Sequence, residues 1–142
     1  MTLFKVGFTG TQTGMTRYQK QQVVFHLARL AKTYQTLEIH HGDCIGADAE
    51  FHSISLKYWP NTLQVIVHPT YIRGKRAGCT SPNQTTLPVK PPLERNRDIV
   101  DAVDGMFAAP KESEEVLRSG TWAAVRYARK QQVPIIYLKR EL

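Results

Sequence analysis

Three short turns rich in glycine, threonine and serine have the composition of an anion-binding site. The first is Gly7–Gly14, with the sequence GFTGTQTG. Glycine lets main-chain N–H groups approach an anion, and a helix that begins after such a turn adds the positive end of its dipole. We therefore predict that Gly10, Thr11 and Gln12 contact a ligand; a glycine turn needed only for packing is the alternative. The turn matches neither the dinucleotide pattern GxGxxG nor the Walker A pattern.

The second turn is His40–Asp48, with the sequence HHGDCIGAD. Its glycines, Gly42 and Gly46, again allow close approach to the backbone. Asp43 and Asp48 are short acceptors that could bind ribose hydroxyls. For Asp48, capping of the following helix is the alternative. We predict all four residues as ligand contacts.

The same segment holds side chains of the types that bind metals, namely His40, His41, Cys44 and His52. Their spacing matches no closed zinc pattern, and a further ligand would have to come from a distant part of the chain. We therefore predict no metal and no other cofactor. Cys44 is interpreted as a small packed thiol, because the sequence shows no Cys–His pairing that would activate it.

The third turn is Ser119-Gly120-Thr121, which follows the apolar run 105–109 and the charged segment Lys111–Arg118. We predict that Ser119, Gly120 and Thr121 bind phosphate at the start of a helix. The next residue, Trp122, could stack on a base or pack at a helix or subunit contact.

Short apolar runs and helical patterns alternate around these turns. Five strands are predicted at Leu3–Phe8, Leu37–His40, Leu63–His68, Gly105–Ala109 and Pro134–Leu138. Four helices are predicted from about Thr16, where Thr16 and Gln19 form a capping box, over 47–58, after Pro91-Pro92, and over 119–131. Such alternation favours a parallel sheet with helices on both faces. Ligands bind beyond the carboxyl ends of the strands in such sheets, where all three turns lie.

Length and composition favour one globular domain, residues 1–142, without a membrane span. Nineteen Lys and Arg against twelve Asp and Glu give a net charge of +7, which suits a polyanion or only solubility. Two cysteines and the absence of a signal-peptide pattern favour the cytoplasm. The proline-rich segment 69–92 shows no periodicity and is expected to be a lid, a binding loop, a disordered segment or a tolerated insertion.

These pieces, in this order, resemble the SLOG superfamily, which includes the Lonely-guy phosphoribohydrolases and the nucleotide-binding domain of the DNA processing protein A family. The matching segments are Gly7–Thr11, His41–Asp48, Pro92–Asn96 and Ser119–Thr121, so the resemblance covers nearly the whole chain. It implies a Rossmann-like three-layer α/β/α fold with a five-stranded parallel sheet of order 3-2-1-4-5. It also implies a nucleotide or nucleotide-derived ligand, with Arg95 and Asn96 at the site.

The chain departs from the Lonely-guy pattern at the residues that cleave the glycosidic bond. Arg95 matches the arginine of those enzymes, but Ala123 and Ala124 occupy their glutamate positions. Without that carboxylate, the usual acid or base is missing, unless Glu114 or Glu115 replaces it. We therefore predict binding without catalytic residues.

We expect Arg95 to clamp phosphate, so that its removal weakens binding and hardly affects folding; an ion pair with Asp98 on a solvated helix is the alternative. The leading hypothesis is a sensor or sequestering protein for a nucleotide. The alternatives are an N-glycosidase on nucleoside 5′-monophosphates and a single-stranded DNA-binding protein that uses the basic stretches 1–40 and 69–90 with Tyr71 and Trp59. The resemblance also implies a homo-oligomer, for which Val116, Leu117 and Trp122 offer apolar surface.

Overall fold

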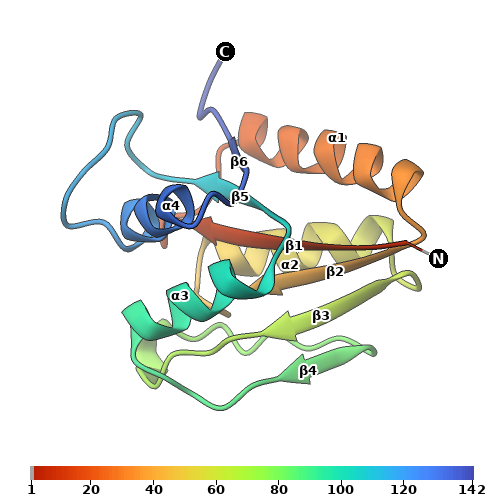
Figure 1. The fold of residues 1–142 in the computed structure, drawn as a ribbon, viewed down its shortest axis with the longest axis horizontal. Coiled ribbons are helices and arrows are strands. Elements are labelled where there is room, and N and C mark those ends of the chain that lie inside the picture. Colours follow the sequence, from red (N-terminus) through yellow and green to blue (C-terminus); the bar gives the residue numbers. More distant parts are fainter. Residues whose placement is uncertain (1) are drawn as a thin grey trace.

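The architecture comes from a computed structural model that describes residues 2–142. Within these residues the chain forms six strands and four α-helices (Figure 1). The elements are β1 (Leu3–Gly10), α1 (Arg17–Thr33), β2 (Thr36–His41), α2 (Ala47–Tyr58), β3 (Leu63–Val67), the short 3₁₀ helix η1 (Arg73–Lys75), β4 (Gln84–Thr86), α3 (Pro92–Ala102), β5 (Gly105–Ala109), α4 (Gly120–Lys130) and β6 (Ile135–Tyr137).

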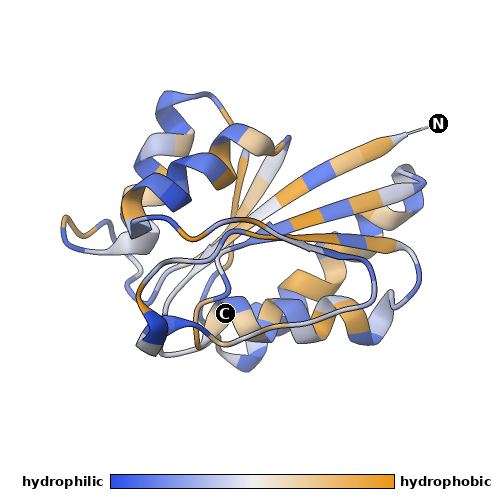
Figure 2. Ribbon diagram, turned by 90° about the horizontal axis from the view of Figure 1, so that it is seen from below, coloured by the Kyte–Doolittle hydropathy of each residue, from blue (hydrophilic) through white to orange (hydrophobic). Residues whose placement is uncertain are grey.

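The six strands form one sheet in the order β4-β3-β2-β1-β5-β6, and all five neighbouring pairs are parallel. Helices α1 and α2 contact each other on one face, while α3 and α4 pack together on the other (Figure 2). The main core, which includes Phe8, Val23, Leu27 and Phe51, fills the space under α1 and α2. This three-layer arrangement confirms the predicted Rossmann-like class.

The prediction of five strands is wrong by one strand. The five expected strands keep their predicted relative order, but β4 is added at the edge, where Val65 to Val67 pair with Gln84 to Thr86. Its sequence, Gln-Thr-Thr, is polar and too short for the periodicity that marks a strand. β4 forms because the outer edge of β3 needs hydrogen-bond partners: the Val65 amide donates to Asn83 and the Leu87 amide to Val67.

The start of α1 shows that local sequence signals set the helix boundaries. Thr16 is the N-cap, and its hydroxyl oxygen accepts a hydrogen bond from the Gln19 amide at 3.1 Å. The Gln19 side chain in turn accepts from the Thr16 amide at 2.9 Å, which completes the predicted capping box. Helix α2 ends at Tyr58, before Pro60, as expected. These boundaries place the three glycine-containing turns at the carboxyl ends of the parallel strands.

Candidate functional site

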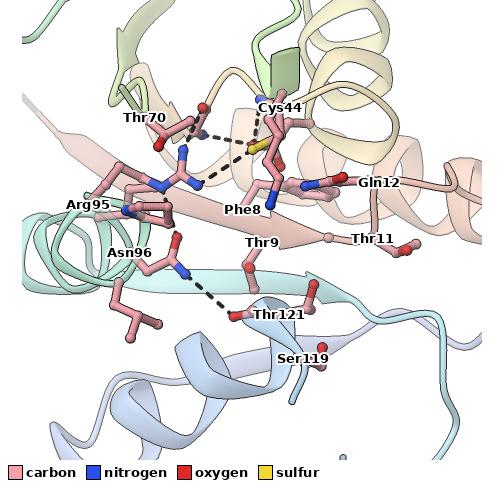
Figure 3. A pocket seen from close by; sticks show the side chains of 18 of the residues that line it. Phe8, Thr9, Thr11, Gln12, Cys44, Thr70, Arg95, Asn96, Ser119 and Thr121 are labelled. Atoms are coloured by element: carbon pink, nitrogen blue, oxygen red, sulfur yellow. Dashed lines mark hydrogen bonds between the residues drawn. The ribbon is translucent and has the colours of Figure 1, made fainter. Parts of the chain in front are cut away.

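A cavity of about 320 Å³ lies beyond the carboxyl ends of β1 and β2 and the starts of α3 and α4 (Figure 3). Ten of the twelve predicted ligand contacts line it: Gly10, Thr11, Gln12, Gly42, Asp48, Arg95, Asn96, Ser119, Gly120 and Thr121. Its volume lies at the lower end of the range for small-molecule sites. The tertiary structure thus brings together all three turns that the sequence singled out.

The two other predicted contacts, Asp43 and Gly46, hold the turn together and do not line the cavity. Asp43 is buried and accepts hydrogen bonds from the main-chain amides of Gly78 and Cys79, at 3.2 and 2.8 Å. Gly46 has a φ of +87°, and a Cβ there would lie 2.3 Å from the Gln12 carbonyl oxygen. Both residues therefore have structural roles, and the structure does not bring them to the cavity with the other ten.

One wall of the cavity is the N-terminus of α4. The Ser119 side chain caps the helix by accepting from the Trp122 amide at 3.2 Å, and no acidic residue stands in the first turn. The first main-chain amides of a helix have no partner within the helix, and the dipole adds positive potential there. A Cβ on Gly120 would meet nothing within 4 Å, so this turn opens onto space. The wall is suited to an anion.

The glycine turn Gly7–Gly14, which follows β1, is less available to phosphate than predicted, because its main-chain groups form hydrogen bonds within the fold. The Thr11 amide donates to the Ala109 carbonyl at 3.0 Å, and the Thr11 carbonyl accepts from Gly14 and Ala47. The Thr11 hydroxyl accepts from the Thr13 amide at 3.2 Å. The expected anion-binding role therefore falls mainly on the turn before α4.

Asp48 lies on the opposite wall and does not cap α2, whose N-cap is Gly46. One carboxylate oxygen, Oδ2, accepts from the amides of Gly42 and Cys44, at 3.0 and 3.2 Å. The second oxygen, Oδ1, accepts no hydrogen bond from residues 2–142, although Asp48 lines the cavity. Burial raises the pKa of Asp48 to about 6, while the nearby Arg95 charge and the two amides oppose that shift. Oδ1 is thus free to accept from a hydroxyl or an amino group of a ligand.

Arg95 is buried and fastens the ends of β2 and β3 to α3. Its Nη1 donates to the carbonyl oxygens of Gly42 and His68, at 2.6 and 3.1 Å, and Nε donates to Asn96 Oδ1 at 2.8 Å. A Cβ at position 42 would lie 2.2 Å from Nη1, so only glycine lets the guanidinium reach this carbonyl.

The bonds of Arg95 bear on two expectations. The alternative of an ion pair with Asp98 is wrong, because Asp98 binds Lys90 at 2.6 Å and Arg95 binds main-chain carbonyls. Loss of the Arg95 side chain would leave two carbonyls without their donor, so we now expect a cost in stability in place of little effect on folding. Only Nη2 remains available to a ligand, beside Cys44 Sγ at 3.5 Å. Burial raises the pKa of the Cys44 thiol, in agreement with a packed thiol and not a nucleophile.

Segment 69–92 forms part of the site. Thr70 and Lys75 line the cavity, and η1 is held against the second turn by a bond from the Ile45 amide to the Lys75 carbonyl at 3.0 Å. These contacts favour the binding-loop alternative for this segment. Lys75 and Lys111 add positive charge to the lining. The sequence analysis missed both lysines, because nothing local indicates that these loops fold back to the strand ends.

Glu114 and Glu115, which the sequence analysis considered as replacements for the missing catalytic carboxylate, do not line the cavity. Glu115 forms ion pairs with Arg126 and Arg129, at 3.0 and 2.8 Å. Glu112, which the sequence analysis did not consider, does line it. Its Oε1 atom is buried and has no hydrogen-bond partner in the described part of the chain. Glu112 is thus the carboxylate that this segment presents to the site.

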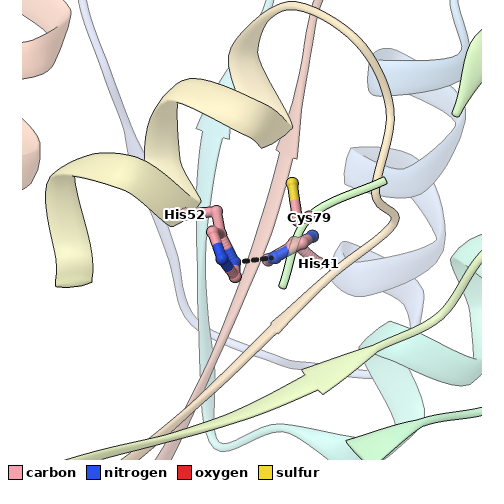
Figure 4. A group of neighbouring side chains, drawn as sticks. All are labelled: His41, His52 and Cys79. Carbon is pink, nitrogen blue, oxygen red and sulfur yellow. Dashed lines mark hydrogen bonds between the residues drawn. The ribbon is translucent and has the colours of Figure 1, made fainter. Parts of the chain in front are cut away.

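A second group of side chains lies on the side of the turn His40–Asp48 that faces away from the cavity (Figure 4). Atoms of His41, His52 and Cys79 that could bind a metal lie within 4.8 Å of one another, which the sequence missed because Cys79 comes from segment 69–92. His41 Nδ1 accepts from the Asp43 amide at 3.0 Å, so the ring proton is on Nε2. That proton is donated to His52 Nδ1 at 2.9 Å, and His52 Nε2 donates to the Thr80 carbonyl at 2.9 Å.

This chain of hydrogen bonds does not fit a metal. A histidine that binds a metal usually donates its other N–H to an acceptor, whereas His41 Nδ1 accepts a hydrogen bond from the Asp43 amide. Burial also lowers the pKa of His41 to about 3 and raises the pKa of Cys79 to about 12, and the Asp43 carboxylate contributes to the second shift. The group therefore acts as a neutral clamp between α2 and segment 69–92.

The residues predicted to form apolar surface divide between surface and core. Leu117 is 84% exposed and Val116 is 37% exposed, whereas Trp122 is 6% exposed and packs against Ala108 and Val125. Of the aromatic residues proposed for a DNA groove, Tyr71 is exposed and Trp59 packs against the main core. No helix within residues 2–142 is long and apolar enough to cross a membrane.

No protein-family model matches the chain, and no curated protein sequence matches it. Among solved structures, it is similar to TM1055, a target of the Northeast Structural Genomics Consortium, with a TM-score of 0.58 and 14% sequence identity. The likeness covers 95% of this chain and 72% of TM1055. At this identity it shows a shared Rossmann-like α/β fold.

Proposed function

We propose that the cavity binds a nucleotide or a nucleotide-derived small molecule, and that the protein acts as its sensor or sequestering protein. The observation that carries the proposal is the pairing of two opposite walls. The N-terminus of α4 offers main-chain amides and has no acidic residue in its first turn, and Asp48 on the other wall keeps one carboxylate oxygen free. Phosphate fits the first wall and a ribose hydroxyl or base amine fits the second.

The charges around the cavity support the same orientation. Lys111 stands on the segment that leads into α4, and Lys75 approaches from segment 69–92. Helix α2, by contrast, carries Asp48 and Glu50 in its first turn, which disfavours an anion there. The phosphate therefore lies toward α4, and the nucleoside lies toward Asp48 and Arg95.

The test is calorimetric titration of the protein with adenosine, AMP, ADP and inorganic phosphate, and with the guanine, cytosine and uracil counterparts. We expect at least one nucleotide to bind clearly more tightly than its nucleoside and than phosphate alone, because both walls are then engaged. Native mass spectrometry of freshly purified protein should show the same compound if it is retained. Equal affinity for nucleoside and nucleotide, or no binding of either, would overturn the proposal.

A second candidate, an N-glycosidase on nucleoside 5′-monophosphates, is favoured by one observation. The cavity holds two carboxylates, Asp48 and Glu112, and the pKa of Asp48 is raised to about 6, which suits an acid or base near neutral pH. Release of free base from a nucleoside monophosphate, abolished in Glu112→Gln, would establish this activity. A single-stranded DNA-binding protein would instead bind oligonucleotides with a steep salt dependence.

A further inference from the structure

A second cavity of about 530 Å³ lies on the other side of the segment that leads into α4. It is bounded by that segment, by the first turn of α4 and by the residues that follow β6. Figure 1 shows this segment, which runs from β5 to α4, as a loop that extends away from the sheet. Two residues, Lys111 and Glu112, line both cavities, so they form the partition between them.

Two aromatic rings line the second cavity. The ring centroids of Trp122 and Tyr137 are 6.3 Å apart, and the ring planes are inclined by 30°. Trp122 is almost fully buried, whereas Tyr137 is 45% exposed and can present a free face. Thr121 lines the first cavity, and the next residue, Trp122, lines the second. A planar ring stacked on Tyr137 would therefore lie on the aromatic pair, beside the start of α4 on this side of the partition.

The same cavity contains unsatisfied polar atoms. Trp122 Nε1 and Glu112 Oε1 are buried and have no hydrogen-bond partner within residues 2–142. A buried polar group without a partner costs free energy, and most proteins avoid it. A ligand that spans both cavities would have to displace the Glu112 side chain, and it would then lie beside both atoms, a donor and an acceptor.

The charged side chains around the second cavity are mixed, with more bases than acids. Lys111 and Glu112 stand on the partition, and Lys139, Arg140 and Glu141 line the second cavity. A ligand that crosses the partition passes the N-terminus of α4 and Lys111, which favour negative charge once the Glu112 side chain is displaced.

On the basis of the proposed function, we infer that the ligand is a dinucleotide whose two nucleosides are joined by a pyrophosphate. One nucleoside occupies the first cavity, the pyrophosphate lies at the start of α4 beside Lys111, and the second ring stacks on Tyr137 in the second cavity. A mononucleotide fills only the first cavity and leaves the aromatic pair unused.

The test compares three probes on the intact protein: ADP, ADP-ribose and NAD⁺. Only NAD⁺ carries a second planar ring. Stacking of a base on an aromatic side chain is worth about 1–3 kcal/mol, so we expect NAD⁺ to bind about 5- to 150-fold more tightly than ADP-ribose. Tyr137→Ala should remove this difference and leave the affinity for ADP unchanged. Tyr137→Phe, which keeps the ring, should preserve the difference.

An optical measurement gives an independent check. Trp59 and Trp122 are the two tryptophans of the chain, and Trp59 lies at the end of α2, remote from the second cavity. In Trp59→Phe, fluorescence then reports on Trp122 alone. NAD⁺ should change this emission, and ADP should not.

The outcomes separate the two proposals. If ADP binds but NAD⁺ and ADP-ribose bind equally well, or if Tyr137→Ala weakens all three probes to the same degree, the second-ring site is refuted and the first cavity stands. If neither ADP nor the other nucleotides bind, the proposed function itself fails.

Discussion

The clearest test of phosphate binding at α4 is the substitution Gly120→Asp. Gly120 is exposed in the first turn of the helix, and a Cβ there would meet no atom within 4 Å, so both aspartate and alanine fit without displacement. An acidic side chain in the first helical turn favours the folded state by about 0.3–1 kcal/mol. Replacement of glycine in a helix adds up to about 1 kcal/mol. We therefore expect Gly120→Asp to be at least as stable as the wild type.

Binding should change in the opposite direction. Two unit charges 4 Å apart interact by about 1 kcal/mol in water and by about 4 kcal/mol at an effective dielectric constant near 20. Gly120 is exposed, so the lower part of this range applies, and nucleotide affinity should fall at least about fivefold. Gly120→Ala should bind as the wild type does, because it gains the Cβ without the charge.

The assay is calorimetric titration at two salt concentrations, together with thermal unfolding of each variant. Ser53→Asp serves as the control for net charge, because Ser53 is exposed on α2 and does not line the cavity. The loss in Gly120→Asp should shrink as salt is raised. If Gly120→Asp binds as tightly as Gly120→Ala, the phosphate does not lie at α4 and the reasoning is refuted.

Further predictions concern stability, pH and assembly. Gly46→Ala should cost several kcal/mol, because its Cβ would lie 2.3 Å from a carbonyl oxygen at a φ of +87°, whereas Gly74→Ala meets nothing within 4 Å; equal melting temperatures of the two variants would contradict this. Arg95→Met should lower the free energy of unfolding by about 2–5 kcal/mol, since two buried carbonyls lose their donor; denaturant unfolding with an unchanged midpoint would show that those bonds contribute nothing. Burial lowers the pKa of His68 to about 4 from an ordinary value near 6.5, so the unfolded state takes up a proton first and stability falls as the pH drops from 6.5 to 4, by up to about 3 kcal/mol. Asp48, with a pKa raised to about 6, acts in the opposite direction between pH 6 and 3.8, so the check is the difference in pH dependence between the wild type and His68→Gln, which should vanish if His68 does not titrate in this window. If the exposed Leu117 lies in a contact between subunits, Leu117→Glu should convert an oligomer into a monomer in sedimentation; a wild-type protein that is already monomeric at micromolar concentration rules this contact out.

The sequence by itself determined the features that depend on neighbours along the chain. The capping box of Thr16 and Gln19, the end of α2 before Pro60 and the buried positions Val23 and Leu27 follow from helical spacing and local hydrogen bonds. Alternation of strands and helices was sufficient for the parallel sheet. The rule that ligands bind at strand ends was sufficient to bring eight predicted residues to one cavity, and the family resemblance added Arg95 and Asn96.

Only the tertiary structure decided which polar groups remain free to bind a ligand. Arg95 is separated by 53 residues from Gly42 and by 27 from His68, and no local pattern shows that their carbonyls occupy its guanidinium. The edge strand β4 and the contact of Cys79 with His41 and His52 likewise arise when segment 69–92 folds back on the sheet. A hydrogen bond between distant residues is fixed by the packing of whole elements, so its donor and acceptor cannot be paired from the sequence.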